Sequence, residues 1–228
     1  TRGWTEDYAQ ADEYFSPDYA YFSSTSNSFL EHAENYSEMI IKELNLTDQS
    51  LVMEIASNDG YLLKNFVSRG IPNFGVEPTE STAKYAMELG IPVDQEFFGV
   101  SYAKKIVSGE APITESFKHK RDSLCDLIIG NNVYAHVNDM DEITKAIKNI
   151  LKPNGLFVFE VSYLLDVINK KLLGTIFHEH LSYHSVKPLI NFFERMNMEI
   201  INIHRNDLQG GSIVCYVQHS DGPYTPTE

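Results

Sequence analysis

The chain has 228 residues, of which 43% are hydrophobic and 12% aromatic. This is enough for one folded domain with a sizeable core, and it argues against wholesale disorder. Its 18 Lys and Arg residues against 32 Asp and Glu residues give a net charge of −14, which disfavours nucleic-acid binding while leaving a compact anionic substrate possible. No apolar stretch reaches the ~20 residues that a membrane helix needs, and no signal peptide opens the chain, so we expect a cytoplasmic protein without a membrane partner.

The first 27 residues form the first predicted unit. Seven aromatic residues stand among polar ones there without a steady period, which predicts a segment that packs on the core. Residues 28–220 are predicted to form the main domain, beginning with an amphipathic helix that Ser26 or Ser28 can cap and that runs to about Leu44. Residues 221–228 look like a linker, the start of a carboxyl-terminal region of which we expect the chain to carry only a part.

An α/β rhythm occupies the middle of the chain. It predicts strands at 51–55, 74–76, 126–129 and 156–161, and helices at 61–69, 80–89, 98–108 and 140–151. The stop signal Pro153-Asn-Gly155 follows the last of these helices. Residues 108–123 are predicted as a loop with a short edge strand. Further on we expect helices at 164–173 and 186–196, then strands at 199–204 and 211–218 joined by a turn at 209–211. The pattern indicates a mostly parallel sheet with helices on both faces and an antiparallel final hairpin.

Two cysteines, Cys125 and Cys215, lie in or beside strand-like runs. Neither belongs to a Cys-x-x-Cys pair, so we predict two buried free thiols rather than a zinc site or a disulfide framework.

The stretch from Met53 to Gly60 is the most informative of the chain. A strand, a turn of small residues and a helix lead to a second strand that ends on Glu77, which is the plan of a nucleotide-type pocket at the carboxyl edge of a parallel sheet. The Gly-x-Gly-x-x-Gly fingerprint of NAD sites is absent. We therefore expect a cofactor without a pyrophosphate, with Glu77 accepting hydrogen bonds from vicinal hydroxyls; the alternative is that Glu54 and Glu77 are ordinary acids at strand ends.

A second cluster of ionisable residues lies between Phe177 and Ser185. Three histidines, a glutamate and a tyrosine there supply general acids and bases near neutral pH. A metal site is the rival interpretation, because His180 and His184 lie four residues apart. The zincin pattern His-Glu-x-x-His is not met, since Ser182 stands at its last position, and no third ligand is evident. Packed structural histidines are the remaining alternative.

These motifs resemble those of class I S-adenosylmethionine-dependent methyltransferases. Residues 54–60 are similar to the first motif of that family, residues 75–78 to the second, and residues 126–132 to the fourth. The resemblance implies a doubly wound, Rossmann-like sheet of seven strands. It also implies an S-adenosylmethionine site, with S-adenosylhomocysteine as product, at these residues: Glu54, Ala56, Ser57, Asn58, Gly60, Glu77, Pro78, Asn131 and Asn132.

The segments 19–24, 30–33, 132–137 and above all 178–180 resemble the sugar C-methyltransferases, which methylate carbon 3 of nucleotide-linked keto-deoxysugars. The resemblance covers about residues 19–217. It departs from that family in three respects: the cysteine-rich amino-terminal zinc domain is absent, the carboxyl-terminal domain is largely absent, and Phe177 stands where tyrosine is common.

This second resemblance implies the catalytic roles. His180 is the expected base that removes a proton beside the ketone, Glu179 orients it or shares that role, and His136 is the partner of the keto oxygen. Substrate contacts are expected from three further residues: Tyr21, His178 and Tyr183. No metal is expected. The alternatives are a methyltransferase of the same fold that acts on another small carbon or oxygen acceptor, and a binding module without catalytic activity.

Overall fold

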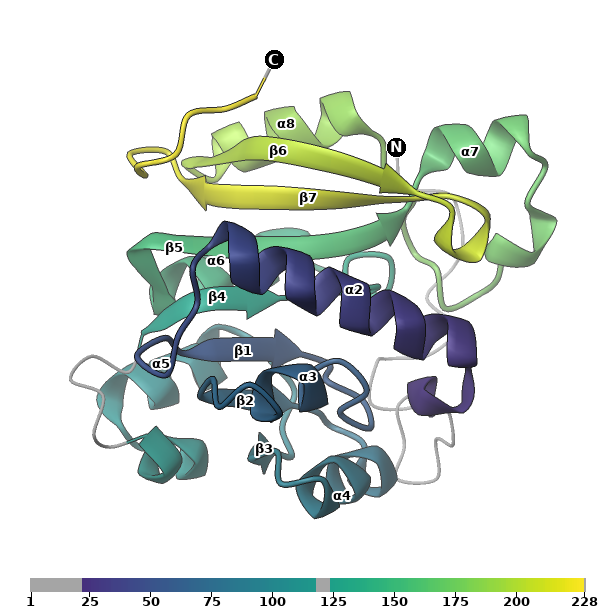
Figure 1. Cartoon of the computed structure of the whole chain (residues 1–228). Helices are drawn as coiled ribbons and strands as arrows, with labels where there is room; N and C mark the ends of the chain where they lie inside the picture. Colours follow the sequence, from purple (N-terminus) through teal and green to yellow (C-terminus); the bar gives the residue numbers. More distant parts are fainter. Residues whose placement is uncertain (1–21, 118–123, 228) are drawn as a thin grey trace.

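The computed structural model describes residues 22–117 and 124–227, and in this part of the chain seven strands form one sheet in the order β3-β2-β1-β4-β5-β7-β6 (Figure 1). The strands β1 to β5 pair in parallel, and β7 lies antiparallel between β5 and β6. The predicted fold class is therefore confirmed. The strand bounds are Val52–Ile55 (β1), Asn73–Val76 (β2), Val93–Asp94 (β3), Cys125–Ile129 (β4), Leu151–Ser162 (β5), Met198–Asn206 (β6) and Ser212–His219 (β7).

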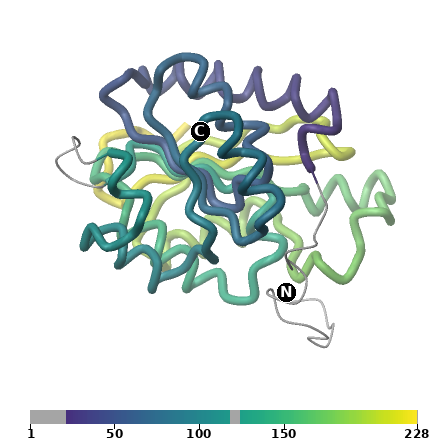
Figure 2. The backbone as a smooth tube through the Cα atoms, turned by 90° about the horizontal axis from the view of Figure 1, so that it is seen from below, coloured from purple at the N-terminus to yellow at the C-terminus, as the bar shows by residue number. Residues whose placement is uncertain are grey.

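Helices cover both faces of the sheet and bury a separate core on each (Figure 2). On one face lie α2 (Asn27–Glu43), α3 (Lys64–Val67) and α4 (Glu80–Glu88). On the other lie α5 (Val100–Ser108), α6 (Met140–Ile150) and α8 (Val186–Arg195). The shorter elements are α7 (Leu164–Asn169), η1 (Ser23–Thr25), η2 (Pro112–Phe117), η3 (Leu173–Thr175) and η4 (Leu208–Gly210).

The amphipathic helix α2 forms as its sequence predicts. The hydroxyl of Ser26 accepts a hydrogen bond from the backbone N–H of Phe29 at 3.5 Å, which caps one of the free donors of the first turn. Its apolar stripe then buries Ala33, Tyr36 and Ile40 against the sheet.

The structure differs from the predicted elements in three places. The helix predicted at 61–69 is only the single turn α3, preceded by turns. The sheet edge beside β2 is formed by β3, which the sequence did not predict. Of the segment predicted as a loop with a short edge strand, residues 112–117 form η2 and residues 118–123 lie outside the described part of the chain. The helix 140–151 ends at Ile150, and Pro153 to Gly155 belong to β5 rather than to a turn.

Pro153 is tolerated in β5 because the pairing with β4 is irregular there. Cys125 pairs with Leu151 and Leu127 pairs with Leu156, so the residues between form a bulge in which a missing backbone N–H costs no regular ladder bond. A Cβ on Gly155 would lie 2.8 Å from the carbonyl oxygen of Cys125, so this close approach requires glycine.

The carboxyl ends of the parallel strands meet at one edge of the sheet, on the right in Figure 1. Because β7 is antiparallel to β5 and Ser212 pairs with Ser162, the turn between β6 and β7 lies at this same edge, next to α7. Polar groups from distant parts of the chain thereby come together there.

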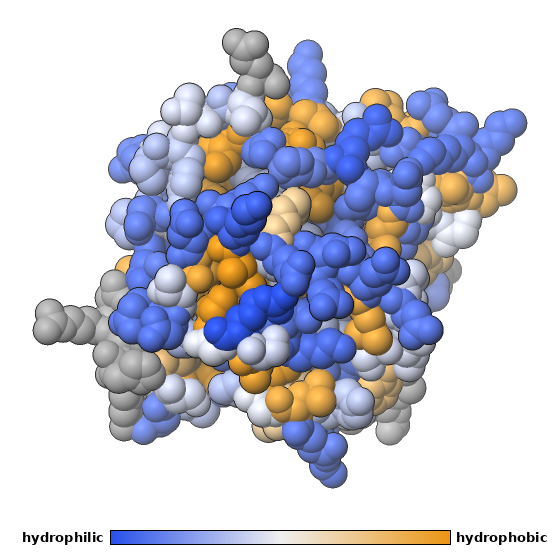
Figure 3. Space-filling view, viewed as in Figure 1, coloured by the Kyte–Doolittle hydropathy of each residue, from blue (hydrophilic) through white to orange (hydrophobic). Residues whose placement is uncertain are grey.

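The face of the molecule shown in Figure 3 is mostly hydrophilic, with hydrophobic residues in small separate patches. Within the described residues no helix is long and apolar enough to cross a membrane. The two cysteines, Cys125 in β4 and Cys215 in β7, are buried free thiols, as predicted.

Candidate active site

A cavity of about 690 Å³ opens at the carboxyl edge of the sheet, within the usual range for small-molecule sites. Segments that are far apart in the sequence contribute to its wall. Nine of the predicted site residues line it: Ala56, Asn58, Glu77, Pro78, Asn131, Asn132, His136, Glu179 and His180.

The carboxylate of Glu77 organises the loop that follows β1. Its Oε2 accepts a hydrogen bond from the backbone N–H of Asn58 at 2.9 Å, and its Oε1 accepts one from the N–H of Thr79 at 2.9 Å. Glu77 is only 4% exposed and borders the cavity. A carboxylate has about four acceptor sites, so capacity remains on the cavity side after these two bonds.

The loop after β1, which Glu77 holds through Asn58, bends sharply. Ala56 and Asn58 both have positive φ, 53° and 50°, a left-handed conformation that is costly for alanine and milder for asparagine. The loop is also held from outside, because the backbone N–H of Ser23 donates to Oδ1 of Asn58 and that of Ser24 donates to Oδ2 of Asp59, both at 3.0 Å. Segment 22–25 therefore borders the cavity at Ser23, whereas Tyr21, a predicted substrate contact, lies outside the described residues.

Three predicted cofactor residues lie behind the cavity wall. Glu54, Ser57 and Gly60 are not among the lining residues, and Glu54 is 2% exposed. Burial raises the pKa of Glu54 well above its usual range, and the neighbouring carboxylates of Asp59 and Glu77 raise it further. Gly60 has φ 75°, and a Cβ there would collide with Ile91, so this glycine serves the packing of the loop.

His180 is oriented by a backbone carbonyl. Its Nδ1 lies 2.9 Å from the carbonyl oxygen of Thr175, and since a carbonyl only accepts, Nδ1 carries the hydrogen. In the neutral ring Nε2 is then the unprotonated nitrogen, able to accept a proton. Burial lowers the pKa of His180, opposed by the bond to Thr175 and the charge of Glu179, so the ring is neutral at pH 7.

His136 packs edge-on against His180, with 4.9 Å between the ring centroids. Burial lowers the pKa of His136 to about 4, and the neighbouring His180 lowers it as well, while a hydrogen bond with the backbone of Glu179 opposes the shift. The two rings thus form a neutral pair at one end of the cavity.

The segment that follows His180 is fixed to the segment that precedes His136. The N–H of Leu181 donates to the carbonyl of Ala135 at 2.7 Å. The carbonyl of Tyr134 accepts from the hydroxyl of Ser182 at 2.9 Å and from Nε2–H of His184 at 3.2 Å. These contacts hold the two histidine rings together.

His184 is therefore a buried structural residue, and it does not share a site with His180. Among the described residues no group of three or more His, Cys, Asp or Glu side chains is arranged to hold a metal ion.

Two other residues of the 177–185 segment lie away from the cavity wall. The hydroxyl of Tyr183 donates to the carbonyl of Thr175 at 3.2 Å, the same oxygen that orients His180. The side chain of His178 is 69% exposed. Neither is among the lining residues, so the structure does not support direct substrate contacts for them.

Several lining residues had no signal in the sequence. Phe97 and Phe98 precede α5. Glu142 lies in the first turn of α6, and its Oε1 accepts a hydrogen bond from the N–H of Val100 at 2.7 Å. Gln209 lines the cavity from the β6–β7 turn. These positions are separated by tens of residues in the chain and form no motif, so only the folded chain unites them.

The helix α2 also supports the site through buried polar contacts that the sequence did not reveal. The hydroxyl of Tyr36 donates to Oδ1 of Asn131 at 3.2 Å. The ring of His32 lies 2.7 Å from Oε2 of Glu160, whose other oxygen accepts from Asn206 at 2.7 Å. Glu160 is 1% exposed, so its charge needs these partners.

The low pKa of His136 predicts a pH-dependent stability. The unfolded chain binds a proton at this residue near pH 6.5 and the folded chain only near pH 4. The free energy of unfolding is therefore unaffected by His136 above about pH 7 and falls as the pH drops towards 4. Between pH 7.5 and 5 the loss from this one group is about 2 kcal/mol.

Denaturant unfolding of the wild type and of His136→Phe at both pH values measures this contribution. Other groups titrate in both proteins, so the difference between the two pH dependences isolates His136. The variant should lose less stability on acidification, and equal losses in the two proteins would contradict the buried, neutral ring.

Comparison with known proteins agrees with this geometry. A family model described as a methyltransferase domain matches residues 28–203. The C-methyltransferase NovU of Streptomyces niveus is 31% identical over 198 residues, which are 87% of this chain and 44% of the relative, so the chain spans less than half of that protein.

Solved structures share the fold at low sequence identity. The magnesium protoporphyrin IX methyltransferase ChlM of Synechocystis PCC 6803, with bound SAH, is 11% identical with a TM-score of 0.61 over 83% of each chain. A SAM-dependent methyltransferase of Thiobacillus denitrificans in complex with S-adenosyl-L-homocysteine is 10% identical with a TM-score of 0.55 over 81% of this chain and 91% of that one. With the family model matching most of its length, the chain belongs to the methyltransferase-domain family and has the class I methyltransferase fold.

Proposed function

We propose that the chain is an S-adenosylmethionine-dependent C-methyltransferase that methylates carbon 3, next to the ketone, of a nucleotide-linked keto-deoxysugar. One observation carries the proposal: two suitable side chains line the same cavity. The buried carboxylate of Glu77 can accept hydrogen bonds from hydroxyl groups, and Nε2 of His180 can accept a proton. The likeness to a C-methyltransferase supports the type of acceptor atom.

The residues present fit the cofactor. Glu77 has acceptor capacity left for the two ribose hydroxyls, and Pro78, Phe97 and Phe98 offer apolar surface for the adenine ring. The bent loop at Ala56 and Asn58 leaves its backbone beside the cavity for the amino-acid portion. When bound, S-adenosylmethionine supplies a sulfonium-activated methyl group and leaves as S-adenosylhomocysteine.

The protein must make a carbon nucleophilic. His180 accepts the proton from carbon 3 on Nε2 while Nδ1–H stays bonded to Thr175, so the ring becomes an imidazolium without turning. The electron pair of the broken C–H bond forms the enolate and then the new C–C bond to the methyl carbon. Glu179, which lines the same cavity and raises the pKa of His180, stabilises that positive charge.

His136 is suited to the oxyanion. With a pKa of about 4 it is neutral and carries a single N–H, which is engaged in a hydrogen bond with the backbone of Glu179. Donation to the keto oxygen would replace this bond as negative charge develops on that oxygen. The two neutral histidines in contact would then have different roles, His180 as the base and His136 as the hydrogen-bond donor.

A second candidate function is favoured by one feature of the wall. Among the described residues that line the cavity there is no Lys or Arg to neutralise a diphosphate. A nucleotide-linked sugar would keep its diphosphate outside the described lining, whereas an uncharged small carbon or oxygen acceptor would fit without that requirement. We further propose a cytoplasmic location, in keeping with two free thiols.

Calorimetry and mass spectrometry test the proposal in two steps. S-adenosylhomocysteine should bind the chain with a stoichiometry of one, and methyl transfer to a nucleoside-diphosphate 4-keto-deoxysugar should add one methyl group at carbon 3. Methylation of an uncharged ketone or hydroxyl acceptor, without transfer to the keto sugar, would establish the second candidate. Cofactor binding without transfer to either acceptor would indicate a binding module.

A further inference from the structure

The turn between β6 and β7 brings a side chain to the cavity that neither motif includes. Gln209 in η4 lines the cavity together with Phe177, Glu179 and His180. Its amide can both donate and accept a hydrogen bond. Within the described part of the chain this side chain makes no hydrogen bond of its own, so its full capacity is available to a ligand.

The sheet order places Gln209 far from the proposed ribose site. Glu77 follows β2, whereas Gln209 precedes β7, and four strand spacings separate β2 from β7. At ~4.8 Å each, these spacings amount to about 19 Å across the sheet edge. A ligand group held by Glu77 therefore lies across the sheet edge from Gln209, which shares the cavity wall with His180.

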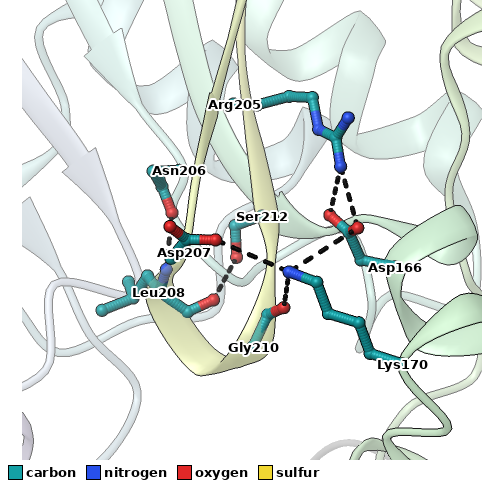
Figure 4. Close-up of polar contacts among 8 residues, drawn as sticks. All are labelled: Asp166, Lys170, Arg205, Asn206, Asp207, Leu208, Gly210 and Ser212. Carbon is teal, nitrogen blue, oxygen red and sulfur yellow. Dashed lines mark hydrogen bonds and ion pairs between the residues drawn. The ribbon is translucent and has the colours of Figure 1, made fainter.

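Ion pairs between the hairpin and α7 hold this turn in place (Figure 4). Arg205 of β6 donates from Nη2 to both carboxylate oxygens of Asp166 at 2.8 Å. Lys170 donates to the carbonyl of Gly210 at 2.7 Å and lies 3.5 Å from a carboxylate oxygen of Asp207. Asp207, two residues before Gln209, and Gly210, directly after it, are thus both bound to one lysine.

The backbone of the turn depends on its glycines and not on Gln209. Gly211 has φ 146°, and a Cβ there would collide with the carboxylate of Asp166. Gln209 itself has φ 51° and ψ 27°, a left-handed conformation that asparagine adopts at least as readily as glutamine. A change from Gln to Asn therefore shortens the side chain without straining the turn.

The geometry points to Gln209 as a specificity-determining residue whose amide binds a hydroxyl of the acceptor sugar. This inference rests on the proposed function and adds a residue to its acceptor site. The clamp of Asp166, Lys170 and Arg205 holds the backbone of the turn that carries Gln209 in place before the acceptor binds. The turn itself therefore needs no ordering on binding.

The test compares Gln209→Asn with Gln49→Asn, the same substitution at an exposed glutamine between α2 and β1, away from the cavity. With a nucleoside-diphosphate 4-keto-deoxysugar as acceptor, Gln209→Asn should raise KM roughly 3- to 10-fold, the size expected for one uncharged hydrogen bond. The kcat should stay within about twofold, and the dissociation constant of S-adenosylhomocysteine should not change. Gln49→Asn should match the wild type in all three.

The outcomes separate this inference from the proposed function. A wild type that methylates the keto sugar and a Gln209→Asn variant with unchanged KM would refute the role of Gln209 alone. Weaker binding of S-adenosylhomocysteine in the variant would also refute it, because the amide would then serve the cofactor. If the wild type fails to bind or methylate the keto sugar, the proposed function fails and this inference with it.

Discussion

Replacing His180 by alanine should lower the rate of methyl transfer by about 10³-fold while leaving the affinity for S-adenosylhomocysteine unchanged. The variant loses Nε2, the nitrogen that the bond from Nδ1 to Thr175 leaves unprotonated, but it leaves Glu77 and the loop after β1 intact. Rates measured by mass spectrometry and affinity measured by calorimetry give the two halves of the result.

Proton exchange tests the base without the methyl donor. In deuterated buffer with S-adenosylhomocysteine present, the wild type should exchange the hydrogen on carbon 3 of the keto sugar, as seen by NMR, and His180→Ala should not. His219→Ala is the matched control, since this ring lies 3.2 Å from the carbonyl of Leu151, at the start of β5 and away from the cavity. Exchange at the wild-type rate in His180→Ala would assign the base to another group.

Replacing Glu77 by glutamine should weaken the binding of S-adenosylhomocysteine by about 10- to 100-fold, the usual effect of losing hydrogen bonds to a charged group. An amide cannot accept on both sides, so its NH2 group would face either the N–H of Asn58 or that of Thr79, and the loop would lose one support. Calorimetric titration measures the affinity, and thermal unfolding shows how much of the change is loss of folded structure.

Glu88→Gln provides the control for this change. Glu88 ends α4 and is exposed outside the cavity, so the variant has the same change of net charge without the loss of the acceptor. Equal affinities of Glu77→Gln and the wild type would show that the cofactor does not rest on this carboxylate, and the proposed orientation of the ligand would have to be abandoned.

The part of the cavity wall that follows β1 and β2 could be predicted from sequence because its signals are local. Parallel strands present their carboxyl ends at one edge, so a run such as residues 53–60 followed by Glu77 places its small residues and its acid correctly from sequence order alone. Within that run the sequence could not separate lining from supporting residues. Glu54 and Gly60 have the pattern of the motif, yet they face the packed interior behind Ala56 and Asn58.

The arrangement around His180 depended on contacts across the fold. The cluster at 178–184 showed that acid–base chemistry was available, but three histidines in seven residues look alike in sequence. Hydrogen bonds to Thr175 and Tyr134 distinguish His180, which faces the cavity, from His184, which supports it.

The sequence by itself determined the fold class, the edge of the sheet that carries the site and the acid expected to bind hydroxyls, because these follow from the order of strands and helices. Only the tertiary structure decided that His136 meets His180, that Glu142 and the two phenylalanines before α5 complete the wall, and that Gln209 reaches the cavity from a hairpin turn. The reason is physical: those positions depend on the antiparallel insertion of β7 and on long-range hydrogen bonds, which leave no periodic trace in the chain.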